Sequence, residues 1–343
     1  MKKKYKNFSG QRSFFGDQKK LDKLKELGDR LIRLKNEVNW DIFRPIIEKH
    51  LYKGGQQGGR PPYDYIIMLK ILVLQRYYNM SDVETEYQLN DRLSFQRFLD
   101  IGLDDDIPDE STISHFKEQL SKAGLIKKLF RIFIKEIKKK GLIGKKGTIV
   151  DASFVEVPKQ RNSKEENDQI KKGETPEKWN NPNKIAQKDM DARWVKKNNV
   201  SHYGYKNHIK VDAKSKLVLN YATTNASVHD SQVLDDLLEN EDKEKELYAD
   251  SAYKSDETDK KLKVKKIHNK VHERAYRNKP LTKRQIKKNS KKSSTRVRVE
   301  HIFGFVENSM GGSHIRSIGQ VMADTNIGLM NFTYNIFRTL QLT

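Results

Sequence analysis

The sequence of 343 residues predicts an α/β protein, in which an all-helical N-terminal domain precedes a mixed sheet flanked by helices. Three observations predict this fold class. Apolar residues recur at helical spacing in several segments up to Lys140, β-branched residues become frequent from Gly147, and residues 320–340 form an apolar segment of helical character. Helices followed by strands and then by further helices are typical of a mixed α/β layer.

We expect the N-terminal helical domain at residues 1–145. Residues 1–18 are basic and look disordered, and the segment GGQQGGRPP at 54–62 is typical of a linker. Leucines spaced three and four residues apart predict a first helix over 21–38. Further helices are expected at 63–78, 81–89, 92–99, 111–120 and 125–140.

The helices between residues 81 and 120 have the length and spacing of a helix-turn-helix-like unit. In such a unit the second helix enters the major groove of DNA and contacts base edges with its first residues. The segment ESTISHFKEQL would be this recognition helix, with Ser111, Thr112 and Ser114 at its start. A plain helical bundle is the alternative interpretation.

The second domain is expected at residues 146–343. A first strand over 147–157 is followed by a polar stretch at about 158–200, which we interpret as an insertion. Clean alternation of apolar and polar residues predicts a strand over 203–211, which returns as a hairpin through LVLNYATT. A helix at 231–238 and a short strand at 246–249 are expected to follow.

The charge of the chain points to a polyanionic partner. The formal net charge is +22, and residues 254–298 hold 18 Lys and Arg against 4 Asp and Glu. Such a cluster favours nucleic acid, although a solvated basic loop has the same composition. Cysteine is absent, which excludes disulfides and cysteine-based zinc fingers. Without a secretory signal or an apolar run long enough to span a bilayer, we expect a soluble, cytoplasmic, nucleoid-associated protein with no membrane partner.

Three acidic residues stand in three different kinds of local sequence. Asp151 lies in the apolar strand segment GTIVDASFVEV, where a charge is costly unless it is paired or coordinated. Asp250 follows a strand ending in LYA, and Glu300 lies in the helical segment RVRVEHIFGFVENSM. Alone, Asp250 could be an N-cap and Glu300 an exposed acid paired with Arg296. Together the three could hold two Mg²⁺ or Mn²⁺ ions, because hard cations prefer oxygen ligands and two of them can cleave a phosphodiester.

Several residues near these acids are candidate DNA contacts. Arg296 lies one helical turn before Glu300 and could donate two hydrogen bonds to a phosphate. The strand over 203–211 places three basic side chains on one face, which could meet phosphates or only solvent. The two tryptophans of the insertion, Trp179 and Trp194, could stack on an unpaired base, or fill a small satellite core. The candidates are Arg296, Arg298, Lys206, His208, Lys210 and Trp194.

The motifs resemble one family nearly from end to end. GRPPYDY, VDASFVEVPKQRNSKEEN, SVHDSQVLDDLL, ADSAYKS and RVRVEHIFG are similar to successive segments of bacterial insertion-sequence transposases of the DDE type. The resemblance is to the large group named after the fifth insertion sequence. It implies an RNase H-like catalytic core in which Asp151, Asp250 and Glu300 form the metal-binding catalytic triad.

The family's glutamate motif is Tyr-x2-Arg-x3-Glu-x6-Lys, in which Arg296 and Glu300 match while Ser293 and Glu307 replace the tyrosine and the lysine. The resemblance implies a DNA transposase that cuts at the terminal inverted repeats of its element. It would join the freed 3′-hydroxyl to target DNA, acting as a homodimer on double-stranded DNA. A nuclease of the same fold without strand transfer, and a catalytically inactive DNA-binding derivative, are the alternatives.

Overall fold

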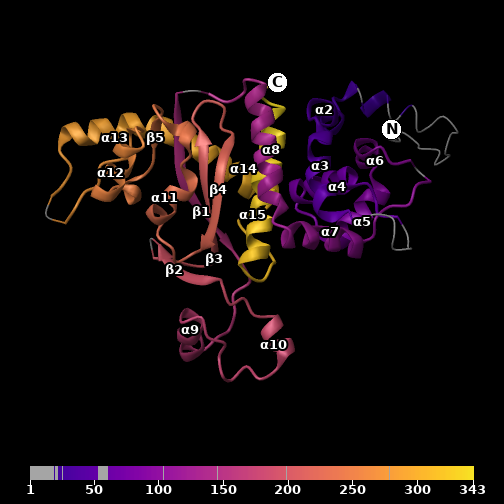
Figure 1. Ribbon diagram of the computed structural model, residues 1–343, viewed down its shortest axis with the longest axis horizontal. Coiled ribbons are helices and arrows are strands. Elements are labelled where there is room, and N and C mark those ends of the chain that lie inside the picture. Colours follow the sequence, from indigo (N-terminus) through magenta and orange to yellow (C-terminus); the bar gives the residue numbers. More distant parts are fainter. Residues whose placement is uncertain are drawn as a thin grey trace, which may run out of the picture.

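The computed structural model describes residues 19, 22–24, 26–52, 61–102, 104–144, 146–197, 199–277 and 279–343. The expected basic segment 1–18 and most of the expected linker at 54–62 lie outside the described residues. Elsewhere the predicted helices and strands follow one another in the predicted order, with further elements between them (Figure 1). Within the described ranges, no helix combines the length and the apolar character needed to cross a membrane.

The N-terminal half is helical, and polar side chains start its helices. Its elements are α2 (Arg30–Glu37), η1 (Trp40–Phe43), α3 (Arg44–Leu51), α4 (Tyr65–Tyr77), α5 (Asp82–Asp91), α6 (Leu93–Leu99), α7 (Glu110–Lys122) and α8 (Leu125–Lys139). The side chains of Asp64, Ser81 and Asp109 accept backbone hydrogen bonds as N-caps of α4, α5 and α7. Most of α4 is buried, as its continuous apolar sequence predicts.

The first predicted helix is interrupted. Residues 22–24 and 26 are helical, but the chain turns at Gly28, whose φ of 77° lies in the left-handed region. α2 then begins at Arg30, with Asp29 as its N-cap. A glycine in this conformation commonly ends a helix. The leucine spacing over 21–38 therefore belongs to two helical segments, and the expectation of one helix was wrong.

The sheet is mixed. Its strands are β1 (Gly147–Glu156), β2 (Arg193–Lys197), β3 (Val200–Asp212), β4 (Val218–Asn225), β5 (Glu246–Tyr248) and β6 (His268–Asn269). The strand order is β2-β3-β1-β5-β6, and β4 also pairs with β3. β3 is antiparallel to β1, β2 and β4, whereas β1, β5 and β6 are parallel to one another. This connectivity agrees with the predicted RNase H-like mixed sheet.

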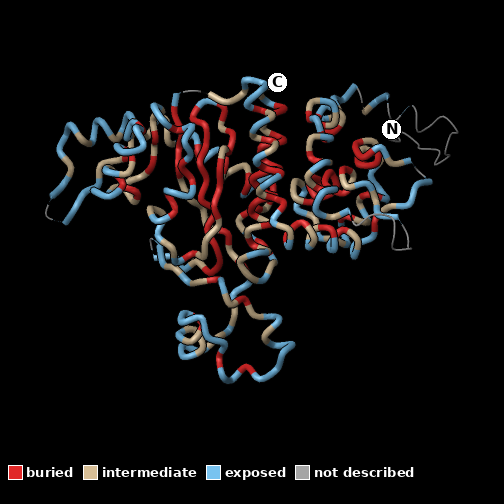
Figure 2. The backbone as a smooth tube through the Cα atoms, in the orientation of Figure 1, coloured by how far each residue is buried: buried red, intermediate tan, exposed pale blue. Residues whose placement is uncertain are grey.

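One helix joins the helical half to the sheet. α15 (Gln320–Thr339) contacts β4 on one side and α4, α7 and α8 on the other, as Figure 1 shows. Most of its residues are buried (Figure 2). The main hydrophobic cluster passes from Phe43 and Leu69 in the helices to Ile149 and Tyr221 in the sheet. The two halves share one core, and the domain boundary near residue 145 stays a prediction.

The opposite face of the sheet carries a second, smaller hydrophobic cluster. There α11 (Leu234–Leu237) and α12 (Asp256–Val264) pack against Val150 of β1 and Leu247 of β5. Because side chains alternate along a strand, Val150 faces this cluster while Asp151 faces the same side as the main cluster. The carboxylate of Asp151 therefore lies on the face of the sheet opposite α11 and α12.

The insertion expected at about 158–200 contains two short helices, α9 (Lys164–Lys171) and α10 (Pro182–Ala186). They project from one end of the sheet (Figure 1). Trp179 is buried among them and donates its Nε1–H to Glu166 Oε1 at 2.7 Å. This tryptophan fills a small satellite core, which was the alternative interpretation of its role.

Candidate active site

Asp151 lies in the middle of β1, and only 14% of its side chain is exposed. Oδ1 accepts a hydrogen bond from the Ala152 N–H at 2.9 Å, and Oδ2 accepts one from Arg296 Nη1 at 2.7 Å. Burial raises the pKa of Asp151 to about 6; the charges of Asp250 and Glu300 add to the rise, and Ala152 and Arg296 oppose it. A carboxylate in this position is stabilised in its ionised form by a cation.

Asp250 is placed beside the β1 aspartate by the register of the parallel strands. Tyr248, the last residue of β5, pairs with Ile149 on β1; Asp250 and Asp151 each follow two residues later, and the charge of Asp250 acts on Asp151. Asp250 Oδ1 accepts a hydrogen bond from the Ala252 N–H at 2.8 Å and caps the turn η4 (Ser251–Tyr253). The N-cap alternative is therefore correct for one oxygen, while Oδ2 makes no hydrogen bond or ion pair with the described residues.

Glu300 is the first residue of α14 (Glu300–Met310). A single helix was expected around it, but the chain forms α13 (Lys283–Arg296), the 3-10 turn η5 (Val297–Val299) and then α14. Burial of Val299, Ile302 and Met310 fixes α14 on the main core. The Glu300 side chain is 55% exposed, and its Oε1 lies 3.7 Å from Arg296 Nη1.

Arg296 lies between the acids. Its Nη1 is within ion-pair distance of both Asp151 and Glu300, and no group of three or more His, Asp or Glu side chains in the described part of the chain is arranged to hold a metal ion. The donor chemistry still fits Mg²⁺ or Mn²⁺, because two aspartates and a glutamate offer only oxygen ligands. A cation at Asp151 Oδ2 would have to replace the guanidinium.

The structure corrects the expectation for the basic face of β3. Lys206 donates to Asp230 at 2.8 Å, and Lys210, 1% exposed in its side chain, donates to Glu239 and Asp242. His208 is fully buried, with Nε2 2.9 Å from Thr224 Oγ1, and burial lowers its pKa to about 4. All three side chains face away from Asp151, which pairs with Ile209. They are therefore neither free nor placed to contact DNA at the site.

The other candidate DNA contacts are accessible. Trp194 on β2 is 43% exposed and packs at an angle on Tyr203. Arg298 is exposed and donates Nη1 to the Ala213 carbonyl at 2.6 Å. At the start of α7 the exposed or half-exposed residues are Ser111, Thr112 and Ser114. That these residues contact DNA stays a prediction.

A basic helix leads directly to the acids. α13 has the sequence KRQIKKNSKKSSTR and buries no residue, and it ends at Arg296. The exposed cations Lys283, Lys287, Lys288 and Lys291 lie along it without an ion pair to any described residue. Beside α13 lies His272, which the sequence analysis missed, because nothing in the segment HNKVHER distinguishes it from a loop histidine.

Acidic side chains from β1, from the turn after β5 and from α14, next to an exposed basic helix, are typical of an enzyme that acts on nucleic acid phosphates. Residues 143–336 match the family described as the transposase DDE domain, and residues 19–119 match the transposase domain DUF772. The chain belongs to the DDE transposase family and is a DNA transposase, an enzyme of metal-dependent DNA cleavage and strand transfer.

One solved structure with a similar fold is a piggyBac transposase synaptic complex with hairpin DNA, determined by cryo-electron microscopy. The similarity covers 90% of this chain and 72% of that chain, at 11% sequence identity and a TM-score of 0.43.

Proposed function

We propose that Asp151, Asp250 and Glu300 are the catalytic residues of this transposase and hold two ions of Mg²⁺ or Mn²⁺. The observation that carries the proposal is that the guanidinium of Arg296 lies within ion-pair distance of both Asp151 and Glu300. Burial, together with the charges of Asp250 and Glu300, raises the pKa of Asp151 to about 6. Asp151 would bind both ions, Asp250 would bind one of them, and Glu300 would bind the other. When bound, the ions would activate the attacking hydroxyl and stabilise the leaving oxygen.

Arg296 would then change partners. It compensates the charge of Asp151 in the structure, and its guanidinium carries more donors than this carboxylate uses. We propose that it turns to a phosphate oxygen of the bound DNA when cations take its place between the acids. Arg298 and the lysines of α13 would extend the positive surface along the same DNA strand.

We further propose how the rest of the chain binds DNA and how many chains act together. The helices up to residue 145 would bind the terminal inverted repeat, with Ser111, Thr112 and Ser114 of α7 at the bases, and Trp194 would stack on an unpaired base near the cut. Two ends must be joined to one target, so the active species would be a homodimer. The chain would belong to the group named after the fifth insertion sequence.

The proposal is tested by a cleavage and joining assay. The substrate is a duplex that carries one terminal repeat of the element, with a circular plasmid as target and Mg²⁺ or Mn²⁺ as cation. We expect Asp151→Asn, Asp250→Asn and Glu300→Gln each to lower the cleavage rate by about 1000-fold or more, because residues of one catalytic unit fail together. DNA affinity should be retained. Joined products would identify strand transfer, and nicks alone would identify a nuclease.

Two exposed acids provide matched controls. Asp256 lies at the start of α12, close in the chain to Asp250, and Glu307 lies two turns after Glu300 on α14. Asp256→Asn and Glu307→Gln should cut at the rate of the unaltered protein. Cleavage without any divalent cation, or an equal loss of DNA binding in all three catalytic variants, would contradict the proposal.

A further inference from the structure

β6 and the residues after it form a ladder of hydrogen bonds with β5 and with Ala249, the residue before Asp250. His268 N–H donates to Lys245 O, Lys270 N–H donates to Leu247 O, and His272 N–H donates to Ala249 O at 3.1 Å. The alternation of these bonds is that of parallel strands, and it extends one residue beyond β5, to Ala249. The backbone of His272 is therefore held beside the residue that precedes Asp250.

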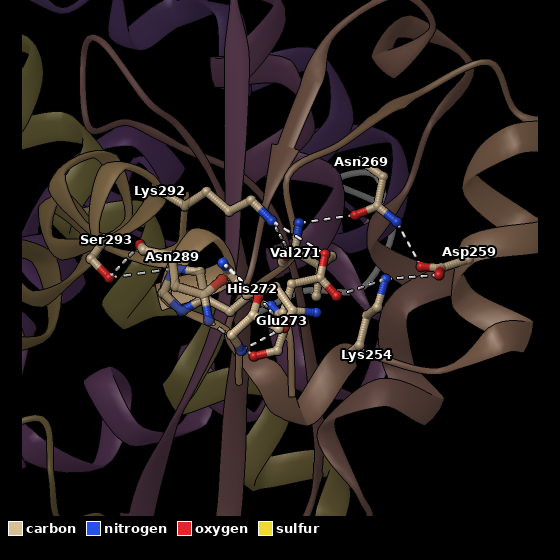
Figure 3. A network of polar contacts seen from close by, with 11 residues as sticks. Lys254, Asp259, Asn269, Val271, His272, Glu273, Asn289, Lys292 and Ser293 are labelled. Atoms are coloured by element: carbon tan, nitrogen blue, oxygen red, sulfur yellow. Dashed lines mark hydrogen bonds and ion pairs between the residues drawn. The ribbon is translucent and has the colours of Figure 1, made fainter. Parts of the chain in front are cut away.

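Both neighbours of His272 are also fixed, as Figure 3 shows. Lys292 Nζ donates to Val271 O at 2.6 Å, and the Asn289 side chain accepts from Glu273 N–H at 2.9 Å and donates to Glu273 O at 3.0 Å. These clamps come from α13. On the other side of the loop, Lys254, Asp259 and Asn269 form a further network of polar contacts (Figure 3).

The imidazole itself takes no part in these clamps. Its one hydrogen-bond contact with the described residues is a long one, 3.4 Å from Nε2 to Ser293 Oγ. The position of the loop therefore depends on backbone groups and on the side chains of Lys292 and Asn289, and not on the ring. The ring is half-buried, and the charges that act on it include those of Arg296 and Asp250. The ring therefore lies near the acids, and the position of the loop does not depend on it.

We propose that His272 is a further DNA contact of the active site, whose imidazole N–H donates a hydrogen bond to a phosphate oxygen of the strand bound across Asp250 and Arg296. This inference rests on the proposed function of the three acids. A site lined by carboxylates repels a phosphodiester, and a donor held in place before DNA arrives needs no reorganisation to bind it. The clamped loop after β6 provides such a donor.

The test compares His272→Ala and His272→Asn with His268→Ala. His268 lies four residues earlier, exposed, with its Nε2 3.7 Å from Glu244, so it is a matched control outside the site. Cleavage is measured in a single turnover on duplexes carrying one terminal repeat, each with one phosphate replaced by a neutral methylphosphonate. We expect His272→Ala to cut about 10- to 100-fold more slowly, because a hydrogen bond to a charged group is lost.

The same experiment separates a contact from a structural role. The defect of His272→Ala should disappear on the one duplex whose contacted phosphate is already neutral, since two changes to one contact are not additive. His272→Asn should recover part of the rate, and His268→Ala should be unaffected. A defect of equal size on every duplex, or no defect, would overturn the assignment of His272. Asp151→Asn is run in parallel, and cleavage by that variant would instead overturn the proposed function.

Discussion

The guanidinium of Arg296 lies against the carboxylate of Asp151, with Nη1 2.7 Å from Oδ2. This ion pair links the last residue of α13 to the middle of β1, and 25% of the arginine side chain and 14% of the aspartate side chain are exposed. The same nitrogen lies 3.7 Å from Glu300 Oε1. The acid cluster is thus partly neutralised by the chain itself, which permits it to fold before it meets a divalent cation.

Replacing Arg296 should destabilise the protein when no divalent cation is present. In Arg296→Gln the buried Asp151 loses its charged partner, so we expect the free energy of unfolding in EDTA to fall by about 1 to 3 kcal/mol. Added Mn²⁺ should restore more stability to this variant than to the unaltered protein, because the cation no longer competes with a guanidinium. Urea unfolding with and without Mn²⁺ measures both effects.

Arg284→Gln is the control for that measurement, since Arg284 is exposed near the other end of the same helix. It should change neither the stability nor the response to Mn²⁺. An equal response of Arg296→Gln and the unaltered protein to Mn²⁺ would show that the arginine and the cation do not share a site.

Neutralising lysines on α13 should reduce the salt dependence of DNA binding. Each phosphate contact by a cation contributes about 0.9 to the slope of log K against log salt. The double variant Lys287→Gln with Lys288→Gln should therefore lower the slope by up to about 2. The pair Lys260→Gln with Lys263→Gln is the control, because both lysines are exposed on α12, which packs on the sheet face opposite Asp151. An unchanged slope in the α13 variant would place this helix outside the interface.

His208 should make the fold sensitive to acid. Burial holds its pKa at about 4, below the ordinary value of 6.5, so between these values the unfolded chain binds a proton that the folded protein excludes. Stability is therefore lost as the pH falls from 6.5 towards 4, by about 3 kcal/mol in total. His208→Gln can keep the contact with Thr224 without titrating, and its stability should fall less over this range. Parallel curves of unfolding free energy against pH for the two proteins would refute this role.

The two tryptophans of the insertion should respond differently to substitution. Trp194 is exposed, so Trp194→Ala should change the stability by less than about 0.5 kcal/mol, and weaken binding to DNA with an unpaired end by about 1 to 3 kcal/mol. Trp179 is buried, so Trp179→Ala should loosen α9 and speed hydrogen exchange of its amides. Retained affinity of Trp194→Ala for such DNA would exclude stacking by this side chain.

The sequence was sufficient for most of the elements and for naming three acids as candidates, because both depend on local pattern. A charged residue in an apolar strand singled out Asp151, and the strand ending at Ala249 located Asp250. The parallel register of β1 and β5, which no local pattern contains, is what brings these two near each other. The break of the first helix at Gly28 was missed because the leucine spacing continues across it.

The misassigned and missed residues depend on partners far along the chain. Alternation placed Lys206, His208 and Lys210 on one face of a strand, but it could not reveal that α11 covers that face. The carboxylates that pair with the two lysines lie 24 to 32 residues further along the chain. His272 was missed for a similar reason, because its loop is fixed by Asn289 and Lys292, whose positions follow only from the packing of α13.

Asp151, Asp250 and Glu300 are proposed to bind divalent cations at one site. Iron-directed cleavage tests this: Fe²⁺ is bound in place of Mg²⁺, and added ascorbate and peroxide then cut the polypeptide next to the bound iron. We expect cuts near residues 151, 250 and 300, which excess Mg²⁺ suppresses and Asp151→Asn removes. Cuts at other places, or the same cuts in Asp151→Asn, would contradict it.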